Sequence, residues 1–251
     1  MDLQRASSWK RIAAWVLDLM LLCVLAVGAA FGLSAALNYD TYDQMVLAAY
    51  DNYEKQYGVT FDIDQATYEA MTEEERLNYD AAYDALIADE DAMYAYNMVM
   101  NLSLLITTLS VLIAYLVLEF IVPLLLKNGQ TIGKKCFSLG VVRIDGVKVT
   151  PVQMFIRTVL GKFAVETMIP VYVLIMLFWG TMGLGGTIAL LLLLVIQIVC
   201  IAISSNRATI HDRLAGTIAV DIASQKIFET TDDLIAYTKR VHAEQAKRQD
   251  Y

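Results

Sequence analysis

The chain carries WKRIAAWVLDLM at residues 9–20, the start of an apolar run that extends from Ile12 to Leu37. A helix needs about 20 apolar residues to cross the hydrocarbon core of a bilayer, so this run predicts a membrane span. It is longer than the roughly 7 to 15 apolar residues of a signal peptide, which argues against a cleaved leader. Arg11 stands at its start and Asp18 lies within it. Because a charge at the centre of a membrane helix costs roughly 2.5 to 3.5 kcal/mol, both residues are candidates for a structural or functional role.

The charged residues are strongly segregated along the chain. The net charge is −8, although 57% of the residues are hydrophobic. Residues 38–97 hold fifteen Asp and Glu against only Lys55 and Arg76, a local charge of −13, so the rest of the chain is positive by five. Basic loops of membrane proteins stay on the cytoplasmic side, and this acidic insert is therefore predicted to be extracytoplasmic.

Further apolar runs predict three more spans. The first covers residues 98–126. Residues 163–205 are almost continuously apolar and about twice as long as one crossing requires. The glycine-rich sequence GTMGLGG at 180–186 is predicted to turn the chain there, between helices at 163–179 and 187–205.

Short strands are predicted outside the membrane. Residues from Cys136 to Ile144 and from Val147 to Val149 are apolar and β-branched around Asp145-Gly146, a strong hairpin signal. A third candidate strand extends from Thr217 to Ile222, and its pairing would help because an isolated hairpin is marginally stable.

These features predict an all-α integral membrane protein with four transmembrane helices, a small cytoplasmic β-hairpin or sheet and an extracytoplasmic acidic helical insert. Both termini are predicted to be cytoplasmic. The predicted divisions are a cytoplasmic N-terminus and first span at 1–37, the insert at 38–97, the second span at 98–126, a basic cytoplasmic loop at 127–162, a pair of spans at 163–205, and a cytoplasmic tail with a short strand at 206–251.

The insert has the pattern of packed helices. Thr72-Glu-Glu-Glu75 is a capping box and predicts the start of a helix that leads toward the second span. Tyrosines recur at helical spacing and predict a seam between helices with the acids on the solvated face, while a cation-gathering vestibule is the alternative. The tyrosines are Tyr50, Tyr53, Tyr57, Tyr79 and Tyr83.

Three separated features together resemble the RDD family of bacterial membrane proteins. They are Arg11 with Asp18, the sequence GQTIGK at 129–134, and HDRLAGT at 211–217. The resemblance implies that Arg11, Asp18 and Asp212 are the arginine and two aspartates for which the family is named. It also implies a multi-pass protein of the bacterial plasma membrane. Most members have no assigned activity, and ion exchange has been proposed for a few; the long acidic insert departs from the family's short connection.

Each predicted span brings one polar side chain to a similar depth, in the cytoplasmic half of the bilayer. These side chains form a possible ion or proton belt of Asp18, Glu119, Glu166 and Gln197. In one hypothesis the carboxylates bind and exchange a monovalent cation or proton. In the alternative the protein is a non-catalytic scaffold or partner-binding protein, and its buried charges only neutralise one another. The expected pairs are then Lys162 with Glu166, four residues apart, and Arg11 with Asp212.

The sequence contains no recognised motif for catalysis, metal binding or nucleotide binding. No hydrolase or metalloprotease signature is present, so no catalytic residue, metal site or cofactor is predicted and the chain is not expected to be an enzyme. His211 is interpreted as a boundary residue or helix cap. The sequence GQTIGK is too short for a phosphate-binding loop, and Asp62 and Asp64 lack the glycine and glutamate of a calcium loop. The expected partners are the lipid bilayer, a second copy of the chain or other membrane proteins, and a monovalent cation or proton, but no nucleic acid.

Overall fold

The computed structural model describes residues 7–126, 128–170, 209–224 and 226–249, with six further positions between 188 and 199. The chain divides into two compact units. The core unit comprises Met1–Val27 and Ser110–Tyr251, and the insert unit comprises Gly28–Leu109.

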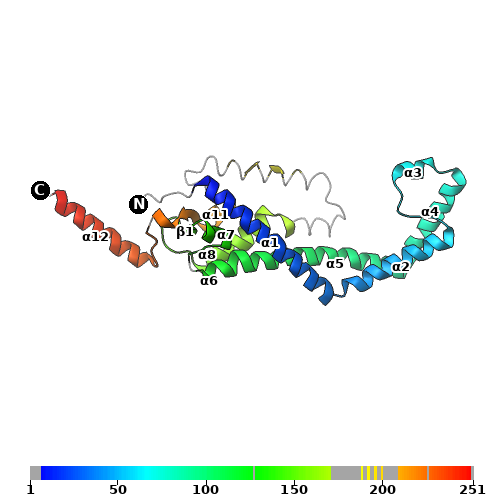
Figure 1. The fold of residues 1–251 in the computed structure, drawn as a ribbon, viewed down its shortest axis with the longest axis horizontal. Coiled ribbons are helices and arrows are strands. Elements are labelled where there is room, and N and C mark those ends of the chain that lie inside the picture. Colours follow the sequence, from blue (N-terminus) through cyan, green and yellow to red (C-terminus); the bar gives the residue numbers. More distant parts are fainter. Residues whose placement is uncertain are drawn as a thin grey trace. The chain divides into compact units, whose positions relative to one another are not determined.

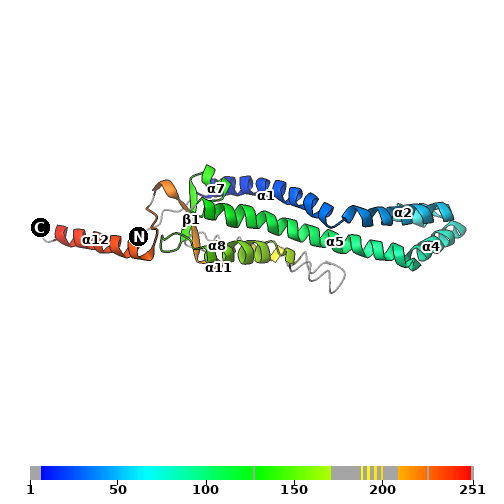
Figure 2. The same ribbon diagram turned by 90° about the horizontal axis from the view of Figure 1, so that it is seen from below.

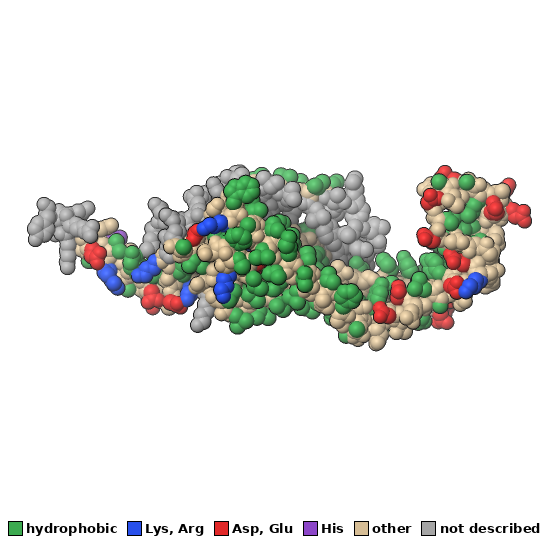
Figure 3. Space-filling view, in the orientation of Figure 1, with side chains coloured by type: hydrophobic (Ala, Val, Ile, Leu, Met, Phe, Trp, Pro, Cys, Tyr) green, Lys and Arg blue, Asp and Glu red, His purple; other side chains and the backbone are tan. Residues whose placement is uncertain are grey.

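Two long apolar helices are present where the first two spans are predicted. Helix α1 covers Ser8–Ala36, and α5 covers Glu90–Tyr115 and continues through the π-helix η1 (Leu116–Ile121) and α6 (Val122–Leu125). By length and composition both are able to cross a membrane. Large apolar side chains stand exposed along α1, and Figure 3 shows apolar surface over this helix. Such exposure fits helices that face lipid.

The remaining elements of the core unit are short. In chain order they are α7 (Ile132–Cys136), β1 (Leu139–Arg143), α8 (Pro151–Phe155), the π-helix η2 (Ile156–Glu166), α11 (Ile210–Ala215), β2 (Thr217–Asp221), the 3-10 helix η3 (Ile222–Ser224) and α12 (Thr231–Gln249). Figure 2 shows α7 beside the first part of α1, and α8 close to α11.

The small sheet is confirmed, with a different pairing. Strand β1 pairs antiparallel with β2, so that Leu139 lies opposite Asp221 and Arg143 opposite Thr217. The predicted hairpin is reduced to one bridge between Val142 and Lys148. All five residues of β2 pair with β1 and four of them are buried, whereas the hairpin arm is too short to compete. The predicted strand also begins too early, because α7 extends to Cys136.

The basic loop before residue 163 contains a helix that was not predicted. It begins at Pro151 and, through η2, reaches Glu166. The predicted single helix at 163–179 is therefore wrong at its start, because Met168 has a left-handed φ of 56° and interrupts the helix after Glu166. Helical backbone resumes at Ile169 and Pro170, and a proline is tolerated in the first turn of a helix. Residues 171–187, with the predicted turn at 180–186, lie outside the described part of the chain, and so does most of the predicted helix at 187–205.

The insert unit contains α2 (Tyr39–Tyr57), α3 (Gln65–Ala70), α4 (Glu73–Ala88) and the beginning of α5. Figure 1 shows these helices following one another along the chain. The capping box at Thr72 is confirmed: Thr72 Oγ1 accepts from the Glu75 N–H, and the Glu75 carboxylate accepts from the Thr72 N–H. The helix ends at Ala88 and a new one begins, because Asp89 accepts hydrogen bonds from the backbone N–H groups of Asp91 and Ala92.

The tyrosine seam of the insert unit is centred on a phenylalanine. The ring of Phe61 makes edge contacts with Tyr50, Tyr79 and Tyr83, and its centroid lies 5.5 to 6.3 Å from theirs. These offset geometries are the favourable arrangement of aromatic rings. Acidic side chains are distributed over the surface of the insert unit, as Figure 3 shows.

Candidate functional site

The core unit contains a group of charged side chains with little exposure, here called the charge cluster. It has four acids, four bases and one histidine. Its members are Arg11, Asp18, Glu119, Lys134, Arg157, Lys162, Glu166, His211 and Asp212. Buried charges are retained only when they are paired and hydrogen-bonded, so the partners of each carboxylate define the site.

Asp18 is bound by the start of α7. Its carboxylate accepts hydrogen bonds from Thr131 Oγ1 at 2.5 Å and from the Gly133 N–H at 2.7 Å, and Lys134 Nζ lies 3.6 Å away. A Cβ on Gly133 would lie 2.3 Å from the Ala14 carbonyl oxygen. The GQTIGK sequence is therefore the segment that binds α1, and its second glycine permits the close approach.

Asp212 has the most complete set of partners. Arg157 reaches its Oδ1 at 2.9 Å and Arg11 reaches its Oδ2 at 3.8 Å, so the expected pair of Arg11 with Asp212 is present but is the longer of the two. The hydroxyls of Thr209 and Thr217 donate to the same carboxylate at 3.0 and 3.1 Å. Burial by itself would raise the pKa of Asp212, but the neighbouring positive charge, chiefly Arg157, holds the pKa below its ordinary value.

His211 connects Glu166 to Arg157. Its Nδ1 lies 2.7 Å from Glu166 Oε1, and its Nε2 lies 3.0 Å from Arg157 Nη2. A guanidinium can only donate, so Nε2 is the acceptor and the proton of a neutral imidazole sits on Nδ1, donating to Glu166. Burial lowers the pKa of His211, in agreement with a neutral ring. The interpretation of His211 as a helix cap is wrong, because Thr209 is the N-cap of α11.

Glu119 is the least satisfied carboxylate of the charge cluster. Its Oε1 lies 2.5 Å from Lys162 Nζ, and only 5% of the residue is exposed. Its Oε2 is buried without a hydrogen-bond partner among the described residues. Its backbone carbonyl accepts from Thr158 Oγ1 at 2.8 Å, which links η1 to η2.

Both π-helices coincide with the charge cluster. Glu119 lies in η1, while Arg157, Lys162 and Glu166 lie in η2. Residues five apart are about 140° apart around an α-helix, and the wider winding of a π-helix, with hydrogen bonds from i to i+5, brings them closer together. Arg157 and Lys162 are both buried. Sequence reasoning missed Arg157 because it placed that residue in the basic cytoplasmic loop, and it assumed α-helical spacing when it paired Lys162 with Glu166, although π-helical turns often occur at functional sites.

The predicted belt is only partly described. Asp18, Glu119 and Glu166 all belong to the charge cluster, and each has a different nearest basic partner. Gln197 lies outside the described residues. The predicted pairing of Lys162 with Glu166 is replaced by contacts between helices, from Lys162 to Glu119 and from Glu166 to His211.

Lys134 is a further buried base that sequence reasoning did not single out. Burial lowers the pKa of Lys134 to about 8, against the opposing effect of Glu119. Its hydroxyl partner Thr131 and its carboxylate partner Asp18 both lie within 3.6 Å. Its place in the GQTIGK sequence was the available signal, but its depth depends on how α7 packs against α1.

Comparison with known proteins identifies the family. No curated protein and no solved structure matches the chain. The family model described as the RDD family matches residues 5–216, which include Arg11, Asp18 and Asp212. The chain therefore belongs to the RDD family.

Proposed function

We propose that this membrane protein exchanges a monovalent cation for a proton, with Glu119 as the exchanging carboxylate. The observation that carries the proposal is the buried Oε2 of Glu119, which has no hydrogen-bond partner among the described residues. An unsatisfied carboxylate oxygen in a low-dielectric site is costly and attracts a cation or a proton.

The pair of Glu119 with Lys162 allows a cation to be exchanged for a proton without a change in the net charge of the site. A cation that binds to the Glu119 carboxylate replaces the positive charge of the Lys162 ammonium, and Lys162 then releases one proton. The site carries the same net charge before and after, so the exchange does not leave an uncompensated charge in the low-dielectric interior. The distance of 2.5 Å between Nζ and Oε1 places the two competing charges in direct contact.

The other carboxylates suit an anchoring role. Asp18 and Asp212 each accept several hydrogen bonds from side chains or backbone as well as facing a base. Lys134, whose pKa is about 8, lies beside Asp18 and within electrostatic reach of Glu119. It can therefore accept or return a proton near neutral pH.

Flux in liposomes tests the exchange. The purified protein is reconstituted with an internal pH dye and given sodium, potassium and lithium gradients in turn. We expect a proton flux that Glu119→Gln abolishes, because an amide keeps the shape but carries no charge, while Asp84→Asn in the exposed insert leaves the flux unchanged. Folded wild-type protein that gives no flux under any gradient would refute the proposal.

A second variant identifies the proton carrier. Lys162→Arg preserves a positive charge next to Glu119, but a guanidinium does not lose its proton in proteins. We expect Lys162→Arg to fold and to lose the proton flux. A normal flux would instead assign the exchanged proton to Glu119.

A scaffold is the second candidate function, and one observation favours it. The four acids and four bases of the charge cluster balance, which is the arrangement of a purely structural network. In that case Glu119→Gln and Asp18→Asn would change the free energy of unfolding and nothing else, and partner binding would be the activity to measure.

We further propose four spans with both termini cytoplasmic and the acidic insert outside. The support is the acidic charge of residues 38–97 and the basic charge of 127–162. In a cysteine-free background, a membrane-impermeant thiol reagent applied to intact cells should label a cysteine at Asn52 but not one at Asp232. Labelling at Asp232 would require an odd number of spans.

A further inference from the structure

The insert unit contains a small apolar pocket with aromatic walls. It lies between α2, α4 and the start of α5 and has a volume of about 180 Å³. The lining residues are Val46, Ala49, Tyr50, Tyr83, Leu86, Ile87, Ala92, Met93 and Tyr96. An apolar cavity of roughly 150 Å³ binds benzene, so this pocket has room for one ring or one branched alkyl group.

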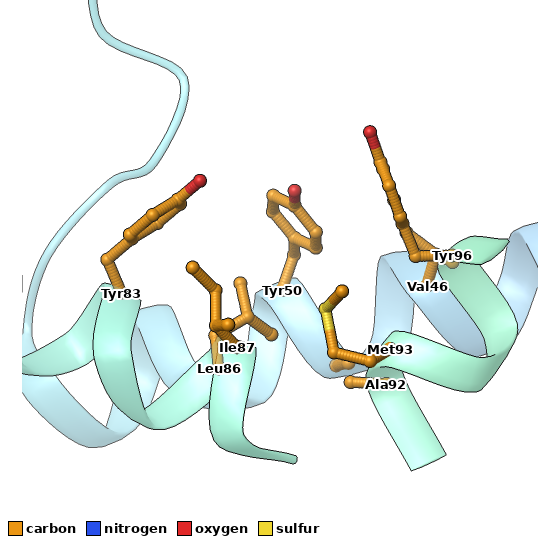
Figure 4. A pocket seen from close by; sticks show the side chains of 9 residues that line it. Val46, Tyr50, Tyr83, Leu86, Ile87, Ala92, Met93 and Tyr96 are labelled. Atoms are coloured by element: carbon orange, nitrogen blue, oxygen red, sulfur yellow. The ribbon is translucent and has the colours of Figure 1, made fainter. Parts of the chain in front are cut away.

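The three tyrosines give the pocket a polar edge. In Figure 4 the hydroxyls of Tyr50, Tyr83 and Tyr96 point to the same side, while Leu86 and Met93 lie between the rings. These hydroxyls make no hydrogen bond within the part of the chain that the structure describes, and the three residues are 36 to 47% exposed. Burial raises the pKa of Tyr50, and the nearness of Tyr83 and Tyr96 raises it further. An apolar ligand with one polar end would match this arrangement.

The charge of the residues around the pocket determines which charge the polar end of a ligand should carry. Glu54 and Asp80 lie one helical turn from Tyr50 and Tyr83, and residues 38–97 carry a net charge of −13. An anionic ligand is repelled by this field, and so is a second copy of the same surface. A cation is attracted both by the acids and by the faces of the aromatic rings.

We propose that this pocket binds a small organic ammonium ion, with its ring or branched alkyl group inside the pocket and its positive charge beside the tyrosine hydroxyls. The site is independent of the exchange at Glu119, because its lining residues all belong to the insert unit.

Binding of benzyltrimethylammonium to the full chain in nanodiscs tests the proposal, with empty nanodiscs as the blank. Isothermal titration should show one saturable site. Benzyl alcohol, which has the ring without the charge, should bind about fivefold more weakly, and benzoate should not bind. Equal affinity for benzyl alcohol or for benzoate would refute the recognition of a cation.

Two neighbouring alanines of α2 provide matched variants. Ala49 lines the pocket, whereas Ala48 is exposed and does not. We expect Ala49→Leu to fill the pocket and weaken binding by at least about tenfold, a change of about 1.4 kcal/mol. Ala48→Leu should stay within about twofold of wild type, and equal binding by both variants and wild type would refute the site.

A second pair of variants tests the site even if Ala49→Leu does not fold. Tyr83→Leu removes a lining ring and should weaken binding of benzyltrimethylammonium by about two- to fivefold, the worth of one exposed cation–π contact. Tyr94→Leu removes a tyrosine that is 55% exposed and does not line the pocket, and should leave the affinity unchanged. A loss that is the same in both variants would also refute the site.

Discussion

The core unit and the insert unit contain ion pairs of similar length in very different surroundings. Arg157 Nη2 and Asp212 Oδ1 are 2.9 Å apart, and their side chains are 3% and 1% exposed. Lys55 Nζ and Asp51 Oδ2 in the insert unit are 2.5 Å apart, but their side chains are 73% and 58% exposed. Water and salt screen the second pair, whereas loss of one partner of the first leaves a charge buried. Distance alone therefore does not rank these interactions.

The two units also differ in what holds their helices together. In the core unit, η2 and α11 are joined by ionic and polar groups such as Arg157, Glu166 and His211. In the insert unit, the rings around Phe61 make the contacts between segments. We expect pH to affect the core unit more strongly, and the predictions below test this and other differences between the two units.

The largest effect is expected at Asp212. Asp212→Ala leaves Arg157 buried without its main partner and should lower the free energy of unfolding by roughly 3 to 5 kcal/mol. Denaturant unfolding of the detergent-solubilised protein measures this. Asp51→Ala, which removes an exposed pair, should cause no measurable change, and similar losses in both variants would contradict the contrast between the units.

Double variants measure how strongly Asp212 interacts with each of its two arginine partners. Because Arg157 is closer than Arg11, the coupling free energy of Arg157→Ala with Asp212→Ala should be the larger. Additive losses for Arg11→Ala and Asp212→Ala would show that the longer contact contributes nothing.

The next effect is expected from a single methyl group. A Cβ on Gly133 would lie 2.3 Å from the Ala14 carbonyl oxygen and 2.9 Å from Asp18 Cγ, so Gly133→Ala should destabilise by roughly 1 to 3 kcal/mol. Gly32→Ala is the control, because nothing lies within 4 Å of its Cβ position and alanine favours the helix. It should be neutral or slightly stabilising, and a loss equal to that of Gly133→Ala would contradict the packing of α7 on α1.

The third effect depends on pH. The folded protein keeps His211 neutral, with a pKa below its ordinary 6.5, so the unfolded chain binds more protons as the pH falls. The stability contributed by neutral His211 is present above pH 6.5 and should be lost below it, by at most about 1.4 kcal/mol per pH unit. Thermal unfolding between about pH 7.5 and 5 measures the slope, which His211→Gln should reduce and His242→Gln should not. An unchanged slope in His211→Gln would contradict the neutral ring.

The smallest effect is expected in the insert unit. Thr72→Ala removes the N-cap of α4 and should destabilise this helix by about 1 kcal/mol. Hydrogen exchange of the first turn of α4 should report the loss, while Thr72→Ser keeps the hydroxyl and the protection. If Thr72→Ala also lowered the protection of η2 against hydrogen exchange, the two units would not respond separately to the substitution.

Local patterns in the sequence determined much of the architecture. The apolar runs predict the positions of α1 and of the helix that begins with α5, and the capping box at Thr72 predicts the start of α4. The motifs containing Arg11, Asp18 and Asp212 identify the family. These signals are readable because hydrophobic length and capping depend on residues close together in the chain.

The tertiary structure decided the partners of the buried charges. Asp18 meets Thr131 across 113 positions, and Glu119 meets Lys162 on another helix. The π-helical winding of η2 brings Arg157 and Lys162 closer together around the helix than α-helical winding would. Sequence shows that a charge is costly in a membrane helix, but its partner depends on distance through space, which only the packed helices determine.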